Sequence, residues 1–323
     1  MPPVVIKLQE AEDPRDVIHL AVEAISAGKV IAIPTETVYG LAASALSPEA
    51  VERIFEIKGR SLESPLAVAV KSIEDAIDFV PDMSEVAQRI ARRSWPGPVT
   101  IVHSAKHPDS VIHRLDPRVQ SATIPQGTIG LRVPANESVQ QILRLCVGPL
   151  VLTSANQTGN PAPTTAQGVV DEISDRVALM LDDGPCEIGK ASTVVHIAGN
   201  QINVLREGSL DAAMIKRLAG FVAIVVCTGN TCRSPMGEAL LKKLIAEKIG
   251  CHTDQLFEKG IQVASAGIAA MPGSPAAEQA VQVMKQNGIE IGDHASQPIT
   301  GRLSQVADLI LTMTNGHRQA LVS

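Results

Sequence analysis

The sequence predicts an α/β protein built from two domains. Its 323 residues are too many for one ordinary hydrophobic core. Short β-rich runs alternate with segments of helical periodicity along the chain, which is the pattern of sheets covered by helices. Near residues 208–220 this pattern begins anew, with a short linking helix and then a new apolar strand. We therefore expect a mixed α/β domain first and a parallel, doubly wound α/β domain second.

Apolar periodicity and turn residues locate the elements of the first domain. Asp13 and Pro14 start one helix and Gly28 ends it, while Ser47 suits the N-cap and Pro48 the first turn of another. Strands are expected where short β-rich runs lead into polar loops. The expected helices are residues 13–28, 47–60, 84–94 and 136–146, and the expected strands are residues 29–44 (entering a turn), 64–70, 99–104, 129–134 and 148–156.

The second domain alternates strands and helices in the order of a parallel sheet. A buried apolar strand opens it and is followed by a loop and a long helix, as in a doubly wound fold. We expect a linking helix at residues 209–220, strands at 221–226, 261–267 and 308–314, and helices at 235–250, 274–289 and 296–307.

Composition and charge exclude several classes of protein. No apolar run reaches the roughly 18 residues that cross a bilayer, and the first residues lack the basic start and apolar core of a secretion signal. A cytoplasmic protein without membrane contact is therefore expected. The five cysteines are too few and odd in number for a disulfide framework, and no Cys or His pairs stand at zinc spacing, so no metal site is expected. The net charge of -6 gives no reason to expect nucleic-acid binding, although a local basic groove stays open.

The stretch VVCTGNTCRSP at residues 225–235 has the features of a phosphate-binding loop. A buried strand delivers Cys227 to its end, and Arg233 and Ser234 open a helix six and seven residues later. Backbone N–H groups in such a loop can surround an oxyanion beside the positive helix terminus, and Arg233 can add a forked contact. The same field favours a nucleophilic thiolate at Cys227, to which Ser234 can donate a hydrogen bond. The expected loop residues are Thr228, Gly229, Asn230 (which tolerates the left-handed conformation), Thr231 and Cys232.

Residues 222–323 resemble the low-molecular-weight protein phosphatase family. The resemblance rests on this loop and on VASAG, HASQPIT and ADLILTMTNGHRQAL further along the chain. It implies that Cys227 is the nucleophile, Arg233 the phosphate-binding residue and Ser234 the group that stabilises the thiolate. Thr231 favours the branch that acts on phosphoarginine in proteins over phosphotyrosine, and arsenate reduction on the same scaffold stays open.

The resemblance also shows a departure in the second domain. The general acid of the family is an Asp in an Asp-Pro context beyond the strand at residues 308–314, and no Asp follows Asp308. The last strand and the closing helix of the family are missing as well. We therefore expect a phosphatase domain that is incomplete at its C-terminal end and whose turnover is weak.

Polar side chains gather on loops that follow the strands of the first domain. Lys58, Arg60 and Arg206 give the density of positive charge that a triphosphate needs, although no Walker or Rossmann fingerprint is present. Each cluster taken alone is also typical of a helix end or a turn, so nucleotide binding stays open at this point. The clustered residues are Thr35, Thr37, Tyr39, Lys58, Arg60, Arg132, Ser154, Asn156, Ser192 and Arg206.

Residues 10–209 resemble the YrdC-like family of threonylcarbamoyl-AMP synthases. The matching stretches are PTETVYGL, IKGRS with SPL, WPGPVTIV, IGLRVP, LTSANQTGNPAPT, DDG, STVV and LREG, in that order. The resemblance implies a twisted mixed sheet and an enzyme that joins L-threonine, bicarbonate and ATP into threonylcarbamoyl-adenylate with release of pyrophosphate. It places threonine on Thr35, Arg132 and Ser192, and ATP on Lys58, Arg60, Thr128, Ser154, Asn156 and Arg206. Mg²⁺ is expected to accompany the triphosphate, with no tightly bound cofactor.

Together the two resemblances predict a fusion of a synthase and a phosphatase domain. The expected boundaries are residues 10–209 for the synthase, 210–220 for a linker and 221–323 for the phosphatase-like domain. The expected partners are the tRNA-modification machinery, an RNA contact (double-stranded) and, for the second domain, a phosphoprotein substrate. The alternative from a different class is an RNA-binding or assembly module that no longer performs synthesis.

Overall fold

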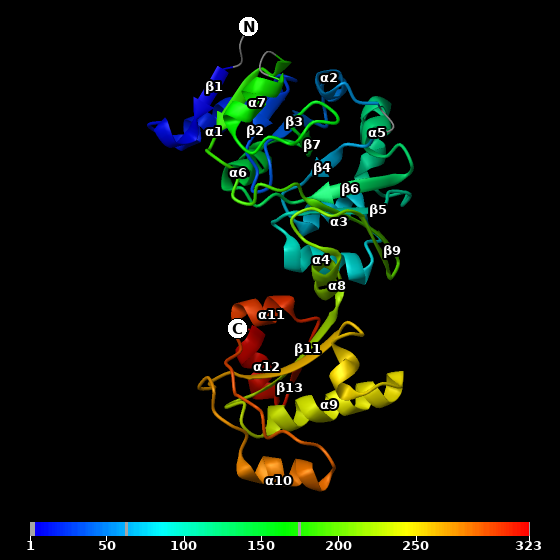
Figure 1. Ribbon diagram of the computed structural model, residues 1–323, viewed down its shortest axis with the longest axis vertical. Helices are drawn as coiled ribbons and strands as arrows, with labels where there is room; N and C mark the ends of the chain where they lie inside the picture. Colours follow the sequence, from blue (N-terminus) through cyan, green and yellow to red (C-terminus); the bar gives the residue numbers. More distant parts are fainter. Residues whose placement is uncertain (1–3, 62–63, 174–175, 323) are drawn as a thin grey trace. The chain divides into compact units, whose positions relative to one another are not determined.

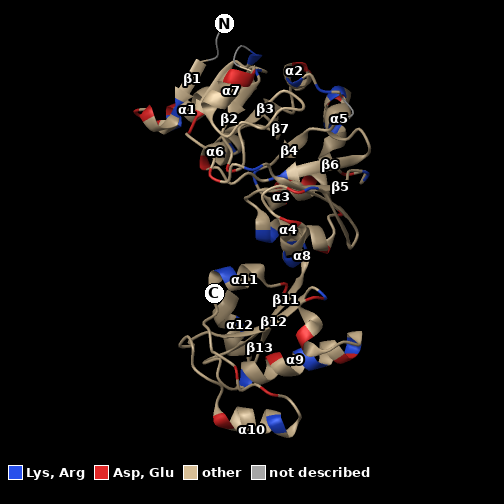
Figure 2. Cartoon of the chain, viewed as in Figure 1, with Lys and Arg blue, Asp and Glu red and all other residues tan. Residues whose placement is uncertain are grey.

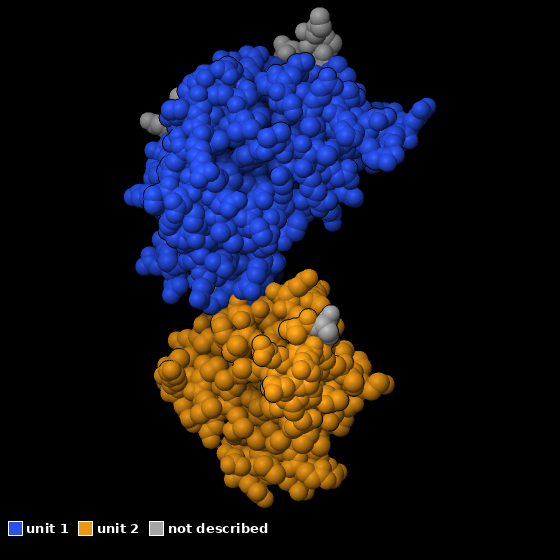
Figure 3. All heavy atoms as spheres, turned by 180° about the vertical axis from the view of Figure 1, so that it is seen from behind, with its two compact units in different colours: residues 1–215 blue, residues 216–323 orange. Residues whose placement is uncertain are grey.

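The computed structural model describes residues 4–61, 64–173 and 176–322. The chain forms two compact units, Met1–Ile215 and Lys216–Ser323, which are drawn in two colours in Figure 3. The division falls within helix α8 (Ala212–Ala219), which lies in the segment expected to link the domains. Ser323, at which the sequence stops, lies outside the described residues. No helix in the described ranges combines the length and the apolar character that a membrane crossing requires.

Unit 1 is built on one mixed sheet (Figure 1). Its described strands lie in the order β1-β8-β2-β3-β7-β4-β6-β5-β9-β10. Antiparallel and parallel neighbours both occur near its centre. Strands β3 and β7 are antiparallel, and strands β4 and β6 are parallel. The strands are β1 (Val4–Lys7), β2 (Ile31–Ile33), β3 (Gly40–Ser44), β4 (Ala67–Ala69), β5 (Val99–Ser104), β6 (Thr128–Arg132), β7 (Leu150–Ser154), β8 (Leu179–Asp182), β9 (Thr193–Ala198) and β10 (Gln201–Arg206).

Helices bury both faces of this sheet. Val151 and Leu152 are neighbours on β7, yet Val151 joins the apolar cluster under α2, α5 and α7, and Leu152 joins the one under α1 and α6. The middle of β7 therefore carries apolar side chains on both faces of the sheet. The helices are α1 (Pro14–Ser26), α2 (Pro48–Lys58), α3 (Ile73–Phe79), α4 (Glu85–Ser94), α5 (Pro117–Thr123), α6 (Glu137–Leu145) and α7 (Ala166–Ile173), with 3-10 turns η1 (Leu8–Glu10) and η2 (Val111–Arg114).

The longer helices of unit 1 were predicted and the shorter ones were not. Asp13 caps α1 by accepting a hydrogen bond from the Arg15 amide, and Gly59 ends α2 in the left-handed conformation. Residues 29–44 form two antiparallel strands, β2 and β3, rather than one strand and a turn. Helices α3, α5 and α7 have only seven, seven and eight residues, which is too short for a clear periodic pattern. Strands β1, β8, β9 and β10 were also missed.

Unit 2 is a smaller parallel sheet with helices on both faces, as predicted (Figure 1). Its described strands lie in the order β12-β11-β13. Val226 of β11 packs with α11 and α12, whereas a Cβ on Gly237 of α9 would touch Val225 on the opposite face. The elements are β11 (Phe221–Cys227), α9 (Arg233–Ile249), η4 (Thr253–Leu256), β12 (Ile261–Gly267), α10 (Glu278–Gln286), α11 (Gly301–Val306), β13 (Leu309–Thr312) and α12 (Asn315–Val322).

Candidate active sites

Unit 1 contains a cavity of about 410 Å³ at the ends of its central strands. Most of the residues predicted for threonine and ATP line it, although they come from loops and strands far apart in the sequence. Apolar side chains of β7, β9 and β10 complete the wall. The predicted residues that line the cavity are Thr35, Arg60, Thr128, Arg132, Ser154, Ser192 and Arg206.

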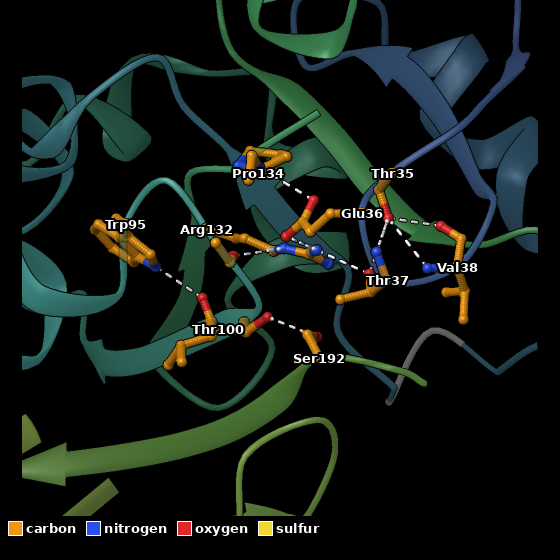
Figure 4. A network of polar contacts seen from close by, with 12 residues as sticks. Thr35, Glu36, Thr37, Val38, Trp95, Thr100, Arg132, Pro134 and Ser192 are labelled. Atoms are coloured by element: carbon orange, nitrogen blue, oxygen red, sulfur yellow. Dashed lines mark hydrogen bonds and ion pairs between the residues drawn. The ribbon is translucent and has the colours of Figure 1, made fainter. Parts of the chain in front are cut away.

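Arg132 is buried at the wall of this cavity and is held at several points (Figure 4). Its Nη2 donates to Oε1 of Glu36 at 2.7 Å and to Oγ1 of Thr37 at 2.8 Å. Its Nε donates to the carbonyl oxygen of Gly97 at 3.3 Å. No acceptor for Nη1 occurs among the described residues, so this nitrogen is left for a ligand.

The PTET segment forms a tight, buried turn beside Arg132. Oγ1 of Thr35 donates to the carbonyl oxygen of Val38 at 2.6 Å and accepts from the amides of Thr37 and Val38 at 3.2 Å. Thr35 thus lies on the cavity wall, but its hydroxyl already forms hydrogen bonds within the turn. A ligand can use Thr35 only as an additional hydrogen-bond partner of this oxygen.

Ser192 holds Arg206 beside the cavity through hydrogen bonds. Arg206 donates from Nε and Nη2 to the Ser192 carbonyl oxygen at 3.2 and 2.9 Å, and from Nη2 to Ser192 Oγ at 3.1 Å. Ser192 Oγ also lies 3.1 Å from Oγ1 of Thr100. Thr100 and Glu36 were not in the predicted set, although both lie inside the sequence stretches that carry the resemblance.

The three arginines make the cavity electropositive. Burial and the neighbouring Arg206 lower the pKa of Arg60, and desolvation and Arg132 lower the pKa of Arg206. Arg206 is nevertheless exposed overall. Among the described residues, Arg60 donates to two neutral acceptors, Thr153 Oγ1 and the Pro65 carbonyl oxygen, both at 3.3 Å. Like charges gathered in this way favour the binding of a polyanion.

Lys58 and Asn156 support the cavity without lining it. The Lys58 ammonium is buried and donates to the carbonyl oxygens of Ser154 at 2.6 Å and Asn156 at 2.8 Å. Nδ2 of Asn156 in turn donates to the carbonyl oxygens of Gln157 at 2.8 Å and Asn160 at 2.7 Å. Burial and the nearby Arg60 lower the pKa of Lys58 to about 8. A direct contact of these two residues with ATP remains a prediction.

Unit 2 places the predicted phosphate loop between β11 and α9. Cys227 ends β11 and is buried, and Ser234 lies in the first turn of α9. The Cys227 sulfur lies 3.0 Å from Ser234 Oγ and accepts a hydrogen bond from the Asn230 amide at 3.3 Å. The sulfur predicted to be the nucleophile therefore lies within hydrogen-bond distance of both the loop backbone and the first turn of α9.

Asn230 holds the loop in shape with both its backbone and its side chain. It is fully buried and has a φ of 55°, in the left-handed region. Nδ2 donates to the hydroxyls of Ser234 and Ser265 at 2.9 Å each, and Oδ1 accepts from the Gln297 amide at 2.8 Å. The side chain therefore joins the loop to β12 and to the segment before α11.

Replacing Asn230 by alanine is expected to destabilise unit 2 by about 2–4 kcal/mol, because the left-handed backbone becomes strained and three polar groups lose their partner. Glycine at this position keeps the backbone and loses only the hydrogen bonds, so its cost should be smaller. Denaturant unfolding followed by far-UV circular dichroism measures both. Trp95, the single tryptophan of the chain, lies in unit 1, so its fluorescence follows the unfolding of unit 1 and serves as an internal reference. A glycine variant as stable as the unaltered chain would contradict the role of the side chain.

The other residues of the phosphate loop lie around its opening. Arg233 is exposed, and its Nη2 donates to Oγ1 of Thr228 at a long 3.4 Å. Thr228 Oγ1 also lies 3.0 Å from Nε2 of His317 on α12, a contact that the sequence did not suggest. Gly229 and Thr231 are half-buried, and Cys232 is exposed. The arginine is thus free to turn toward an anion in the loop.

Comparison with known proteins assigns a family to each part of the chain. Residues 23–208 match the model of the Sua5/YciO/YrdC family, which is described as telomere recombination. Residues 222–323 match the model of the low-molecular-weight phosphotyrosine protein phosphatase. The first match covers more than half of the chain.

Individual relatives agree with the first match, and a solved phosphatase structure resembles part of the second unit in sequence. A threonylcarbamoyl-AMP synthase of Pyrococcus abyssi is 36% identical over 207 residues, which are 64% of this chain and 58% of that protein. The crystal structure of P. abyssi Sua5 complexed with L-threonine is 25% identical, covers 82% of this chain and 92% of that one, and has a TM-score of 0.59. An arginine phosphatase of Geobacillus stearothermophilus is 39% identical over 32% of this chain and 58% of that one, with a TM-score of 0.27.

The chain spans 58% and 53% of the length of its Pyrococcus abyssi and Bacillus subtilis synthase relatives. The matched part includes every loop that lines the cavity of unit 1. The chain belongs to the Sua5/YciO/YrdC family and carries a low-molecular-weight phosphatase domain after its synthase-like domain.

Proposed function

We propose that unit 1 forms threonylcarbamoyl-AMP from L-threonine, bicarbonate and ATP, with release of pyrophosphate, for tRNA modification. The observation that carries the proposal is the convergence of Arg60, Arg132 and Arg206 on one cavity, in a chain of this family. Arg132 offers Nη1 to the carboxylate of threonine, while Arg60 and Arg206 take up the charge of the phosphates. The relatives named as threonylcarbamoyl-AMP synthases support this assignment.

The chemistry requires no covalent intermediate on the protein. The amine of threonine and bicarbonate give a carbamate with loss of water, and an oxygen of this carbamate attacks the α-phosphate of ATP while the bond to the leaving pyrophosphate breaks. The task of the cavity is to align these groups and to stabilise the charge that moves onto pyrophosphate. Mg²⁺ is proposed to enter with the nucleotide substrate, as it commonly accompanies a triphosphate.

The test is pyrophosphate release by the purified chain. Release should require ATP, threonine and bicarbonate together, and omission of any one should stop it. No release from the complete mixture, with RNA retained on the protein, would favour an RNA-binding or assembly module instead. The net charge of -6 gives no reason to expect nucleic-acid binding, and Figure 2 shows both basic and acidic residues on α9 and α10 of unit 2.

Threonine should be preferred strongly over 2-aminobutyrate, which lacks only the hydroxyl. Thr35 and Ser192 place hydroxyl groups on the cavity wall, and a substrate hydroxyl can form a hydrogen bond with them that 2-aminobutyrate cannot form. A site built to pair a substrate hydroxyl can reject such an analogue by about 10⁴-fold. Comparing kcat/KM for the two amino acids measures the preference. Equal values would show that the amino-acid assignment is wrong.

For unit 2 we infer a cysteine-dependent protein phosphatase acting on phosphoarginine or phosphotyrosine. The observation in favour is the set of donors around the buried Cys227 sulfur at the start of α9. Hydrolysis of phosphoarginine and phosphotyrosine peptides by the full chain distinguishes the two substrates. Arsenate reduction in the presence of a thiol reductant tests the remaining alternative.

A further inference from the structure

Glu36 is a buried carboxylate that joins three segments at the wall of the unit 1 cavity (Figure 4). Its Oε1 accepts from Arg132 Nη2 at 2.7 Å, and its Oε2 accepts from the Ala135 amide at 3.0 Å. Its backbone oxygen accepts from the Ile188 amide at 2.8 Å. The guanidinium is therefore fixed to the turn at residues 35–38 and to the loop that follows β6.

A structural need alone does not explain this ion pair. Removing two charges from water is costly, and apolar residues of similar volume stabilise a core equally well. The pair has a geometric consequence instead. Glu36 and Thr37 occupy Nη2 of Arg132, and Gly97 occupies Nε, so the guanidinium presents its remaining nitrogen in one orientation.

The pair also divides the cavity by charge. Glu36 compensates Arg132, whereas no ion pair in the described part of the chain involves Arg60 or Arg206. One end is thus close to neutral, which suits a zwitterionic amino acid. The other end keeps its positive charge, which suits phosphates.

We propose that Glu36 is the positioning residue of the amino-acid end of the cavity. It orients Arg132 so that Nη1 meets the substrate carboxylate, and by compensating its charge it keeps phosphate groups away from that end. The inference rests on the proposed function of unit 1. Glu36 acts through Arg132 and does not itself touch the substrate.

The test compares Glu36→Gln with the unaltered chain. The threonine concentration for half-maximal pyrophosphate release should rise about tenfold or more, because glutamine lacks the negative charge and has only one acceptor oxygen for Arg132 and the Ala135 amide. The ATP concentration for half-maximal release should change less than about twofold. Binding of threonine amide, which has no carboxylate for Arg132, should be unaffected, so the preference for threonine over its amide falls by the same factor. Added pyrophosphate should compete with threonine in the variant and not in the unaltered chain.

Glu12→Gln is the matched control, because Glu12 is an exposed carboxylate of the same unit. If Glu36→Gln does not fold, Glu36→Asp is compared in the same way, since the shorter side chain cannot reach both Arg132 and Ala135. An unchanged preference for threonine over its amide in the folded variant overturns the role of Glu36 and leaves the proposed function intact. Absence of threonine binding and of pyrophosphate release in the unaltered chain would overturn both.

Discussion

Replacing Lys58 by alanine is expected to lower the rate of pyrophosphate release by about 10²-fold or more. The Lys58 ammonium holds the Ser154 and Asn156 carbonyl oxygens at 2.6 and 2.8 Å, and Ser154 lies on the cavity wall. Without the Lys58 ammonium, the loop after β7 loses these two hydrogen bonds, and less positive charge remains beside Arg60. A displacement of about 1 Å in a positioning site is enough for a loss of this size.

Lys29→Ala is the matched control, since Lys29 is an exposed lysine of the same unit. Thermal unfolding followed by Trp95 fluorescence reports on unit 1 and separates a loss of activity from a loss of folding. Two buried carbonyl groups lose a donor in the Lys58 variant, so a decrease of about 1–3 kcal/mol in the free energy of unfolding should accompany the kinetic effect. Turnover equal to that of the unaltered chain would remove Lys58 from the machinery of the site.

The pH dependence gives a second check on the Lys58 charge. Its pKa falls from the ordinary 10.5 to about 8 in the folded protein, so between these values the unfolded chain binds more protons and the contribution of Lys58 to stability rises with pH. Activity, in contrast, should decrease as pH rises. If the ammonium supports phosphate binding, the ATP concentration for half-maximal rate increases as pH rises through about 8. The Lys58→Ala variant should lack this change.

The cavity of unit 1 could be predicted from the sequence because its residues lie at strand ends. Polar residues that follow apolar runs, such as Arg132 in IGLRVP and Ser154 in LVLTSAN, have few roles in a sheet buried on both faces. The sequence also placed Cys227 and Ser234 correctly at the end of a strand and the start of a helix. In each case one local pattern predicts both the element and the functional residue at its end.

The internal partners of these residues could not be predicted in the same way. The Lys58 ammonium meets carbonyl oxygens 96 and 98 residues away in sequence, so nothing near IKGRS indicates that it supports the wall instead of lining it. Glu36 is likewise an ordinary acidic residue in PTET until β6 brings Arg132 beside it. His317 reaches Thr228 across 89 residues. Such contacts depend on strand order, which periodicity does not determine.

Replacing Cys227 by serine is expected to remove the thiol chemistry of unit 2 entirely. The Cys227 sulfur is the group at which the Asn230 amide and the Ser234 hydroxyl meet, and a serine oxygen in its place is a far weaker nucleophile. Whatever hydrolysis of 4-nitrophenyl phosphate the chain performs should fall by at least about 10³-fold. Cys232→Ser is the matched control, because Cys232 lies five positions further along the same loop and is exposed.

Labelling with iodoacetamide tests the same site without requiring turnover. Accessibility alone predicts that the exposed Cys232 reacts first and that the buried Cys227 and Cys146 react last. A loop that favours the thiolate reverses this order for Cys227, and bound phosphate should then protect Cys227 while leaving Cys232 unaffected. Peptide mapping by mass spectrometry reads each cysteine separately, and the Cys227→Ser chain should show no phosphate-sensitive label. A Cys227 that labels no faster than Cys146, or equally fast with and without phosphate, would show that the loop does not hold an anion.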